Sequence, residues 1–257
     1  MQKYMFSKSG AVTAFLIIGV VLVVLSGLIF FVRSEYYKSL FEVQQAGLKT
    51  IPQQAQPLVD YINYCIESTG MDGVAYISER GWKNRPSVSS NVNKLPYFIN
   101  DGKVLMPTKQ QIAVELSEYI DEHLGECTSL IQSNAFTLKL GKPSTNTTIN
   151  PNDISLNVNY PVEFAYGNFS INLDQFQSEL KFSMEKIYVS TSNLLNEQAN
   201  VSSGICLSCM FNTGIKNSLY FQYYTVSDTE YEITIKDYKS LINNNPYTLI
   251  FAIKQKK

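Results

Sequence analysis

The sequence predicts an α+β protein in which an N-terminal transmembrane and stalk helix leads into a helical pair and an antiparallel β-sheet. The first observation is an apolar run over residues 11–32, where no side chain is charged. The second is apolar spacing of three to four residues in two stretches within 51–131, typical of amphipathic helices. The third is alternation of apolar and polar side chains over 154–164, the period of a strand with one exposed face. Helices followed by strands, without βαβ alternation, indicate the α+β class.

The apolar run from Ala11 to Val32 is long enough to cross a membrane. Its 22 residues correspond to a helix of roughly 33 Å, against a hydrocarbon core of about 30 Å. The apolar part of a secretory signal is shorter, at about 7–15 residues. Basic but no acidic side chains precede the run, so residues 1–10 are expected to be a cytoplasmic tail or leader. The body of the chain is then expected outside the cell, with the lipid bilayer as a partner of Ala11 to Val32.

After the membrane segment, a helical stalk is expected over 33–50. Apolar side chains recur there at helical spacing, and no proline interrupts the chain before Pro52. The remaining residues, 51–257, are expected to form one extracytoplasmic α+β domain without internal repeats. Its helical part covers 51–131 and its β-rich part covers 132–257.

Two of the four cysteines fall on helices predicted within 51–131. Pro57 stands in the first turn of the first helix, and Thr108 with Gln111 forms a capping box at the start of the second. The apolar stripes are Leu58, Ile62, Cys65 and Ile66 in the first helix, and Ile112, Leu116, Ile120, Leu124, Cys127 and Ile131 in the second. Three pairings of the four cysteines are possible on paper. Because both stripes carry a cysteine into the same interface, the favoured bridge is Cys65–Cys127.

The segment Cys206-Leu-Ser-Cys209 is the motif of this sequence that could carry chemistry. At a helix start, backbone amides stabilise a thiolate on the first cysteine, which is the basis of redox activity in such motifs. The hydrophobic parallel strand of a thioredoxin setting is missing here, and Leu-Ser replaces Gly-Pro. A zinc site needs further ligands, and the chain has one histidine. A local structural disulfide is favoured, and the alternatives are a redox pair, a metal site and free thiols.

Other chemically capable residues are interpreted as structural. His123 is expected at the surface, on an acidic solvated helix face made by Glu115, Glu118, Asp121 and Glu122. Trp82 belongs to a loop over 81–86, where half-buried packing is favoured over an exposed contact. The sequons at Asn146, Asn168 and Asn200 permit N-glycosylation without arguing for it.

The charge balance excludes one class of partner. The chain has 22 acidic and 21 basic side chains and a formal net charge of −1. No basic stripe with interleaved aromatic residues is present, so a nucleic-acid partner is not expected. No cofactor or metal is expected either.

Further elements follow from turn residues and periodicity. Turns and short strands are predicted over 70–107, around Gly73, Gly81 and Asn100-Asp-Gly102. Gly167-Asn168 turns the strand at 154–164 into a hairpin, and a helix follows over Met184–Gln198. The last predicted elements are strands at Leu219–Val226, Tyr231–Lys236 and Tyr247–Ile253, which complete one antiparallel sheet with a turn at Asn243-Asn-Asn-Pro246.

Two resemblances bear on placement. Lys8-Ser-Gly10-Ala11-Val-Thr-Ala-Phe15 and the apolar run after it resemble archaeal type IV pilin-like signals, which are cut after a small residue, here Gly10. Phe15 stands where pilins usually carry glutamate. The chain also resembles a group of uncharacterised single-pass membrane proteins of small-genome archaea, in the stretches Val12–Gly19, Tyr61–Glu67, Leu116–Ile120, Ile205–Cys209 and Pro246–Ala252. The first resemblance implies a filament subunit, and the second implies membrane placement without a known activity.

The sequence therefore favours a non-enzymatic, membrane-anchored cell-surface protein with a structural or interaction role. A pilin-like filament subunit and an envelope or adhesion component are its two forms, with self-assembly or other envelope proteins as partners. The alternative is an extracytoplasmic thiol–disulfide oxidoreductase, with Cys206 as the nucleophile and Cys209 as the resolving thiol.

Overall fold

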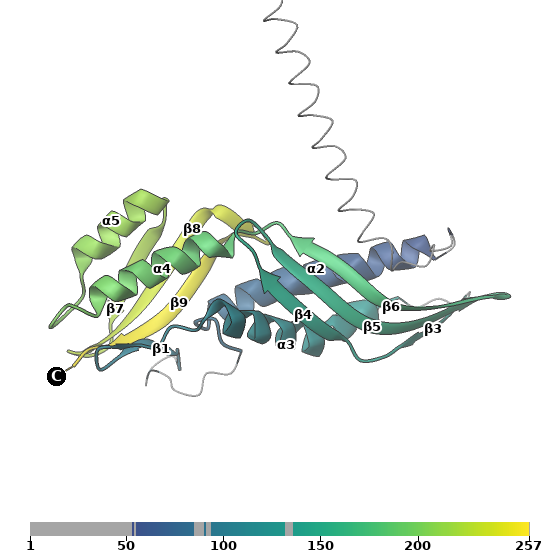
Figure 1. Cartoon of the computed structure of the whole chain (residues 1–257), viewed down its shortest axis with the longest axis horizontal. Coiled ribbons are helices and arrows are strands. Elements are labelled where there is room, and N and C mark those ends of the chain that lie inside the picture. Colours follow the sequence, from purple (N-terminus) through teal and green to yellow (C-terminus); the bar gives the residue numbers. More distant parts are fainter. Residues whose placement is uncertain (1–52, 54, 85–89, 91–93, 132–135, 257) are drawn as a thin grey trace, which may run out of the picture. The chain divides into compact units, whose positions relative to one another are not determined.

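The computed structural model describes residues 53, 55–84, 90, 94–131 and 136–256. The helices and strands of this part of the chain belong to one compact unit, Gln54–Lys257. They are four helices and two β-sheets in which most strand pairs are antiparallel (Figure 1). The predicted transmembrane helix and the stalk at 33–50 lie outside the described residues. Within the described residues, no helix is both long and apolar enough to cross a membrane.

The first two helices, α2 (Gln56–Ser78) and α3 (Lys109–Thr128), pack against each other. Pro57 lies in the first turn of α2. Thr108 and Gln111 form the predicted capping box, in which each side chain bonds the other residue's backbone N–H. Both apolar stripes are buried as predicted, apart from the end of the second stripe, which is half-buried.

Helix α2 is longer than the sequence predicts. Turns were expected from residue 70, but the helix continues through Gly70 and Gly73. A Cβ atom on Gly70 would lie 2.8 Å from Cδ1 of Leu156, and one on Gly73 would lie 2.7 Å from Cδ1 of Leu116. These glycines therefore allow a strand and a helix to approach α2 closely. This packing outweighs the helix propensity that each glycine costs, about 1 kcal/mol.

The first sheet is built around β5 (Ile154–Tyr166), the strand predicted from its alternation, whose inward side chains are buried. After the turn at Gly167, β6 (Phe169–Leu180) pairs antiparallel with β5 along its length. On the other edge, β3 (Thr137–Leu140) and β4 (Ser144–Ile149) pair with β5 one after the other. Helix α3 packs against β4 and α2 against β6 (Figure 1). Strands β3 and β4 were not predicted individually, although they lie in the β-rich part expected over 132–257.

The second sheet has the strand order β2-β1-β9-β8-β7. Its strands are β1 (Tyr97–Asn100), β2 (Lys103–Val104), β7 (Tyr220–Thr225), β8 (Glu230–Ile242) and β9 (Asn245–Lys254). Strand β1 is parallel to β9, and the other pairs are antiparallel. The predicted antiparallel pairing is confirmed for β7, β8 and β9, but the strands form two sheets instead of one, and β1 joins parallel to β9. Alternation shows which face of a strand is buried but does not identify its partners.

Two further helices, α4 (Met184–Gln198) and α5 (Leu207–Asn217), pack against each other beside the second sheet (Figure 1). The bounds of α4 agree with the prediction. Both helices lie between strands in the chain, so helices do not simply precede strands. Helix α2 also reaches the second sheet, since its last residue Ser78 contacts the Tyr247 hydroxyl at 2.8 Å. It therefore packs against both sheets.

Candidate functional site

The first disulfide joins Cys65 in α2 to Cys127 in α3, with Cα atoms 5.7 Å apart. This is the pairing that the two apolar stripes predict. Cys65 is buried, and the hydroxyl of Tyr61 donates a hydrogen bond to the carbonyl oxygen of Cys127 at 3.0 Å. The disulfide and this hydrogen bond both hold the end of α3 against α2, so the role of the disulfide is structural.

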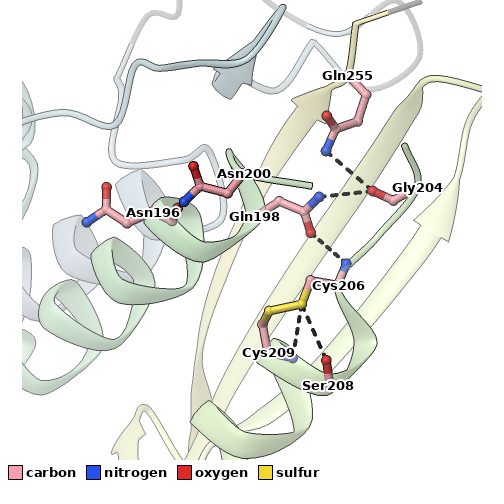
Figure 2. The surroundings of a disulfide bond; sticks show 8 residues. All are labelled: Asn196, Gln198, Asn200, Gly204, Cys206, Ser208, Cys209 and Gln255. Carbon is pink, nitrogen blue, oxygen red and sulfur yellow. Dashed lines mark hydrogen bonds between the residues drawn. A yellow bond between two sulfur atoms is a disulfide. The ribbon is translucent and has the colours of Figure 1, made fainter. Parts of the chain in front are cut away.

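The second disulfide joins Cys206 to Cys209 at the start of α5, with Cα atoms 5.2 Å apart. Cys206 is the N-cap residue of α5, and its Sγ accepts a hydrogen bond from the backbone N–H of Cys209 at 3.3 Å. The hydroxyl of Ser208 lies 3.5 Å from the same sulfur (Figure 2). Both cysteines are half-buried. The pair is therefore a local disulfide at a helix N-terminus, partly open to solvent.

A buried glutamine of α4 fixes the loop that leads to this disulfide. Oε1 of Gln198 accepts from the backbone N–H of Cys206 at 2.8 Å, and its Nε2 donates to the carbonyl oxygen of Gly204 at 2.9 Å. Nε2 of Gln255 donates to the same carbonyl at 3.3 Å (Figure 2). Gly204 has φ = 74°, a left-handed conformation that favours glycine. Helix α4 and Gln255, the residue after β9, thus hold the loop that leads to the cysteine pair.

Next to this disulfide, α5 presents an exposed apolar stripe. Leu207, Phe211 and Ile215 follow one another at a spacing of four residues and are 56%, 67% and 67% exposed. Met210 and Gly214, on the adjoining part of the same helix face, are buried. Helix α5 therefore has one apolar face, only part of which the described core covers.

A groove of about 470 Å³ lies between this stripe and strand β7. Its walls are formed by Leu207, Met210, Phe211, Gly214 and Ile215 from α5 and by Leu219, Tyr220, Phe221 and Tyr223 from the strand side. A Cβ atom on Gly214 would lie 2.9 Å from the carbonyl oxygen of Leu219, so glycine allows α5 to approach β7 closely. No charged side chain is among these lining residues.

Strand β7 is the last strand of its sheet, and β8 is its one partner among the described strands. The N–H of Val226 donates to the carbonyl oxygen of Glu230 at 2.9 Å. Bonded pairs alternate in an antiparallel ladder, so the N–H and C=O groups of Phe221, Tyr223 and Thr225 point away from β8. The groove is therefore bordered by an open strand edge.

Trp82 is buried rather than half-buried, so the looser packing predicted for it was wrong. Its Nε1 donates to the hydroxyl of Tyr247 at 2.8 Å, and its ring lies 5.7 Å from those of Phe98 and Tyr188. Burial raises the pKa of Tyr247, against the lowering effect of its bonds with Ser78 and Trp82. This cluster is part of the core, where α2, α4 and the second sheet meet.

The acidic face of α3 is only partly solvated. His123 is half-exposed, with Nδ1 3.0 Å from Oε1 of Glu126. Glu115, in contrast, binds the Lys83 ammonium at 2.9 Å and the backbone N–H of Asn84 at 2.8 Å, which ties the Trp82 loop to α3. Asp121 is half-buried, and burial raises its pKa. The prediction of a uniformly solvated face was therefore wrong for these two carboxylates.

The three sequons lie in exposed positions. Asn146 is on β4, Asn168 is in the turn between β5 and β6, and Asn200 follows α4, where its Nδ2 donates to the carbonyl oxygen of Asn196 at 2.9 Å. Within the described residues, no group of three or more His, Cys, Asp and Glu side chains is arranged to hold a metal ion.

The residues that form the groove were not predicted from the sequence. The signal that was present is the apolar face of this helix, formed by Leu207, Met210, Phe211 and Ile215 at a spacing of three to four residues. A comparison with family models found no match, and searches among curated proteins and among solved structures found none either.

Proposed function

We propose that this chain is a membrane-anchored surface protein that acts by contacting other proteins. The contact is made through the α5–β7 surface, which consists of the exposed side of α5, the groove and the open edge of β7. The observation that carries the proposal is the exposed stripe of Leu207, Phe211 and Ile215 beside this edge. Contiguous apolar surface of this kind on a folded protein marks an interaction site. The apolar run Ala11–Val32 supports placement of this surface at a membrane.

The interaction is tested by crosslinking in cells that express the full chain. A photoreactive amino acid at position 211 is expected to give covalent protein adducts upon irradiation, because Phe211 would be buried in the complex. The same amino acid at position 130 is the matched control, since Leu130 is 74% exposed but lies just after the end of α3, outside the α5–β7 surface. Adducts at neither position, or equal adducts at both, would contradict the proposal.

Placement and form are tested at the N-terminus. Alkaline extraction should leave the chain in the membrane fraction, and protease added to intact cells should cleave residues 51–257. Mass spectrometry of the mature chain then separates the two forms of the proposal. A chain that begins at Ala11 supports a pilin-like filament subunit, whereas retention of Met1 supports a permanent single-pass anchor.

A second candidate function rests on the geometry of Cys206. Its sulfur lies at the N-terminus of α5 and accepts a hydrogen bond from the N–H of Cys209. The next residue, the exposed Leu207, lines one end of the groove. In the reduced protein, backbone amides at this end stabilise a thiolate. The Cys206 thiolate would attack a substrate disulfide, form a mixed disulfide and release one substrate thiolate. The Cys209 thiolate would then attack Cys206, release the second substrate thiolate and restore the intramolecular disulfide.

An external thiol reductant must reduce this disulfide for each turnover. The activity is tested by insulin reduction with dithiothreitol as that reductant. The full chain should accelerate insulin reduction, and Cys206→Ser should abolish the acceleration. Cys65→Ser with Cys127→Ser is the control, since those sulfurs are structural. No acceleration by the wild-type chain would exclude this second function without affecting the first.

A further inference from the structure

The edges of the two sheets differ in their protection against pairing with another strand. Natural edge strands avoid such pairing by being short or by carrying charged residues. At the other end of the second sheet, β2 has two residues, one of which is Lys103. In the first sheet, β6 carries exposed Asp174 and Glu179. Strand β4 has no charged residue, but α3 packs against it, and the N–H of Thr147 donates to the hydroxyl of Ser117 in α3 at 3.2 Å. Strand β7, with the sequence Tyr-Phe-Gln-Tyr-Tyr-Thr, is six residues long, has no charge and no proline, and its outward edge has no such partner among the described strands.

We propose that the α5–β7 surface binds the same surface of a second copy of this chain, with β7 pairing antiparallel to β7 of that copy. The proposal rests on the proposed function and names its partner. The outward N–H and C=O groups of Phe221, Tyr223 and Thr225 supply the donors and acceptors for the new ladder. The two five-stranded sheets would then form one continuous sheet.

The same symmetry operation also covers the stripe on α5. Two antiparallel copies of one strand are related by a two-fold axis perpendicular to the sheet, which leaves corresponding helices on the same face. Helix α5 packs on β7 with the groove between them, so the α5 helices of both copies would flank the axis. Phe211 and Ile215 of each copy would face their equivalents across it. One contact thus accounts for both the open edge and the uncovered helix face.

The exposed area is sufficient for such a dimer. Six large side chains at this surface are between 47% and 67% exposed: Leu207, Phe211, Ile215, Tyr220, Tyr223 and Tyr224. Aromatic side chains bury about 150–250 Å² each and the two aliphatic ones less, so at these exposures the six would contribute on the order of 600 Å² per copy. The backbone of β7 adds to this area. A standard interface buries about 800 Å² per partner.

The test measures the mass of the full chain, solubilised in detergent, by light scattering at micromolar concentration. A dimer is expected for the wild-type chain. Phe211→Asp places a charge in the apolar contact, and Tyr223→Pro removes an outward N–H that does not bond to β8. Each variant should weaken the dimer by about tenfold or more. Leu130→Asp changes a similarly exposed side chain that lies outside the α5–β7 surface, and this variant should remain dimeric. A monomeric wild-type chain, or dimers that persist in both surface variants, would overturn the proposal.

A crosslink identifies the contact independently of the N-terminal helix. A photoreactive amino acid at position 223 in ¹⁵N-labelled chain, mixed with unlabelled chain, should yield peptides that join the two isotopes at residues 207–225. Far-UV circular dichroism of each variant shows whether it has folded. If, in cells, position 223 forms adducts with a different protein and none with a second copy of this chain, self-pairing is overturned while the proposed interaction function remains intact. If neither position 211 nor position 223 forms adducts, both the self-pairing and the proposed interaction function are contradicted.

Discussion

Nε1 of Trp82 donates a hydrogen bond to the hydroxyl of Tyr247 at 2.8 Å, in a site where both side chains are buried. Trp82 lies just after α2 and Tyr247 lies on β9, so the bond joins two segments 165 residues apart in the sequence. Ser78 contacts the same hydroxyl at 2.8 Å. This hydroxyl therefore fixes the end of α2 against the second sheet.

Tyr247→Phe should destabilise the protein by about 1–3 kcal/mol, because it leaves the buried Nε1 of Trp82 without an acceptor. Trp82 is the single tryptophan of the chain, so urea unfolding of the full chain in detergent can be followed by its fluorescence. Tyr238→Phe is the control, since that ring is 61% exposed; it should change the unfolding free energy by less than about 0.5 kcal/mol. Equal effects of the two variants would contradict this role of the hydroxyl.

The long disulfide should contribute more stability than the short one. Cys65 and Cys127 are 62 residues apart, and closing a loop of that length restricts the unfolded chain by about 4 kcal/mol in the chain-entropy model. Replacing both with serine should lower the unfolding free energy by that order. The separation of three between Cys206 and Cys209 gives about 2 kcal/mol in the same model. Urea titrations of the two double variants compare these values.

A peptide map of the unreduced protein checks the pairing itself. It should show Cys65 linked to Cys127 and Cys206 linked to Cys209. A link between Cys65 and either Cys206 or Cys209 would contradict the packing of α2 against α3. Four free thiols in the mature protein would contradict its expected location outside the cell.

The pair Lys186–Asp237 predicts a loss of stability in acid. Asp237 is almost fully buried and accepts from Lys186 Nζ at 2.7 Å, from the N–H of Lys239 and from the hydroxyl of Ser240. Burial alone would raise the pKa of Asp237, but these hydrogen bonds outweigh it and lower the pKa. The stabilisation is thus present above the unfolded-state pKa of about 3.9 and is lost as the pH falls through the lowered folded-state value.

Asp237→Asn should therefore show a smaller decrease of unfolding free energy than the wild-type chain as the pH falls below about 4. At neutral pH, Lys186→Met should destabilise by about 3 kcal/mol, because it leaves a buried carboxylate without its cation. Lys139→Met is the matched control, since the ion pair of Lys139 with Glu163 is exposed on both sides and should contribute little. Parallel pH profiles for Asp237→Asn and the wild type would disprove the assignment to this carboxylate.

Two helical glycines should respond to alanine in opposite directions. A Cβ atom on Gly73 would lie 2.7 Å from Leu116 and Tyr119, so Gly73→Ala should destabilise by about 1–2 kcal/mol through overpacking. Around Gly125 in α3, a Cβ atom would meet nothing within 4 Å. Gly125→Ala should stabilise by about 0.5–1 kcal/mol through helix propensity. Urea unfolding of both variants tests the close approach of α3 to α2, and stabilisation by Gly73→Ala would contradict it.

Local signals in the sequence determined several elements of the fold. The capping box at Thr108, the alternation along β5 and the helical spacing of α4 each specify backbone geometry within a few residues, and the structure agrees at all three. The Cys65–Cys127 bridge could also be predicted, because each cysteine extends a local apolar stripe. In these cases the residues that give the signal are neighbours in the chain, even where, as for the bridge, two such local patterns meet across 62 residues.

The tertiary structure decided what depends on distant residues. Helix α2 continues through Gly70 and Gly73 because side chains from two strands and a helix, far along the chain, occupy the space that a Cβ atom would take at these glycines. The division of strands into two sheets, and the parallel pairing of β1 with β9, depend on partners that alternation does not specify. The α5–β7 surface is defined by what the rest of the fold leaves uncovered. Its residues show an apolar pattern locally, but only packing determines which part of the apolar face of α5 is buried and which part remains exposed.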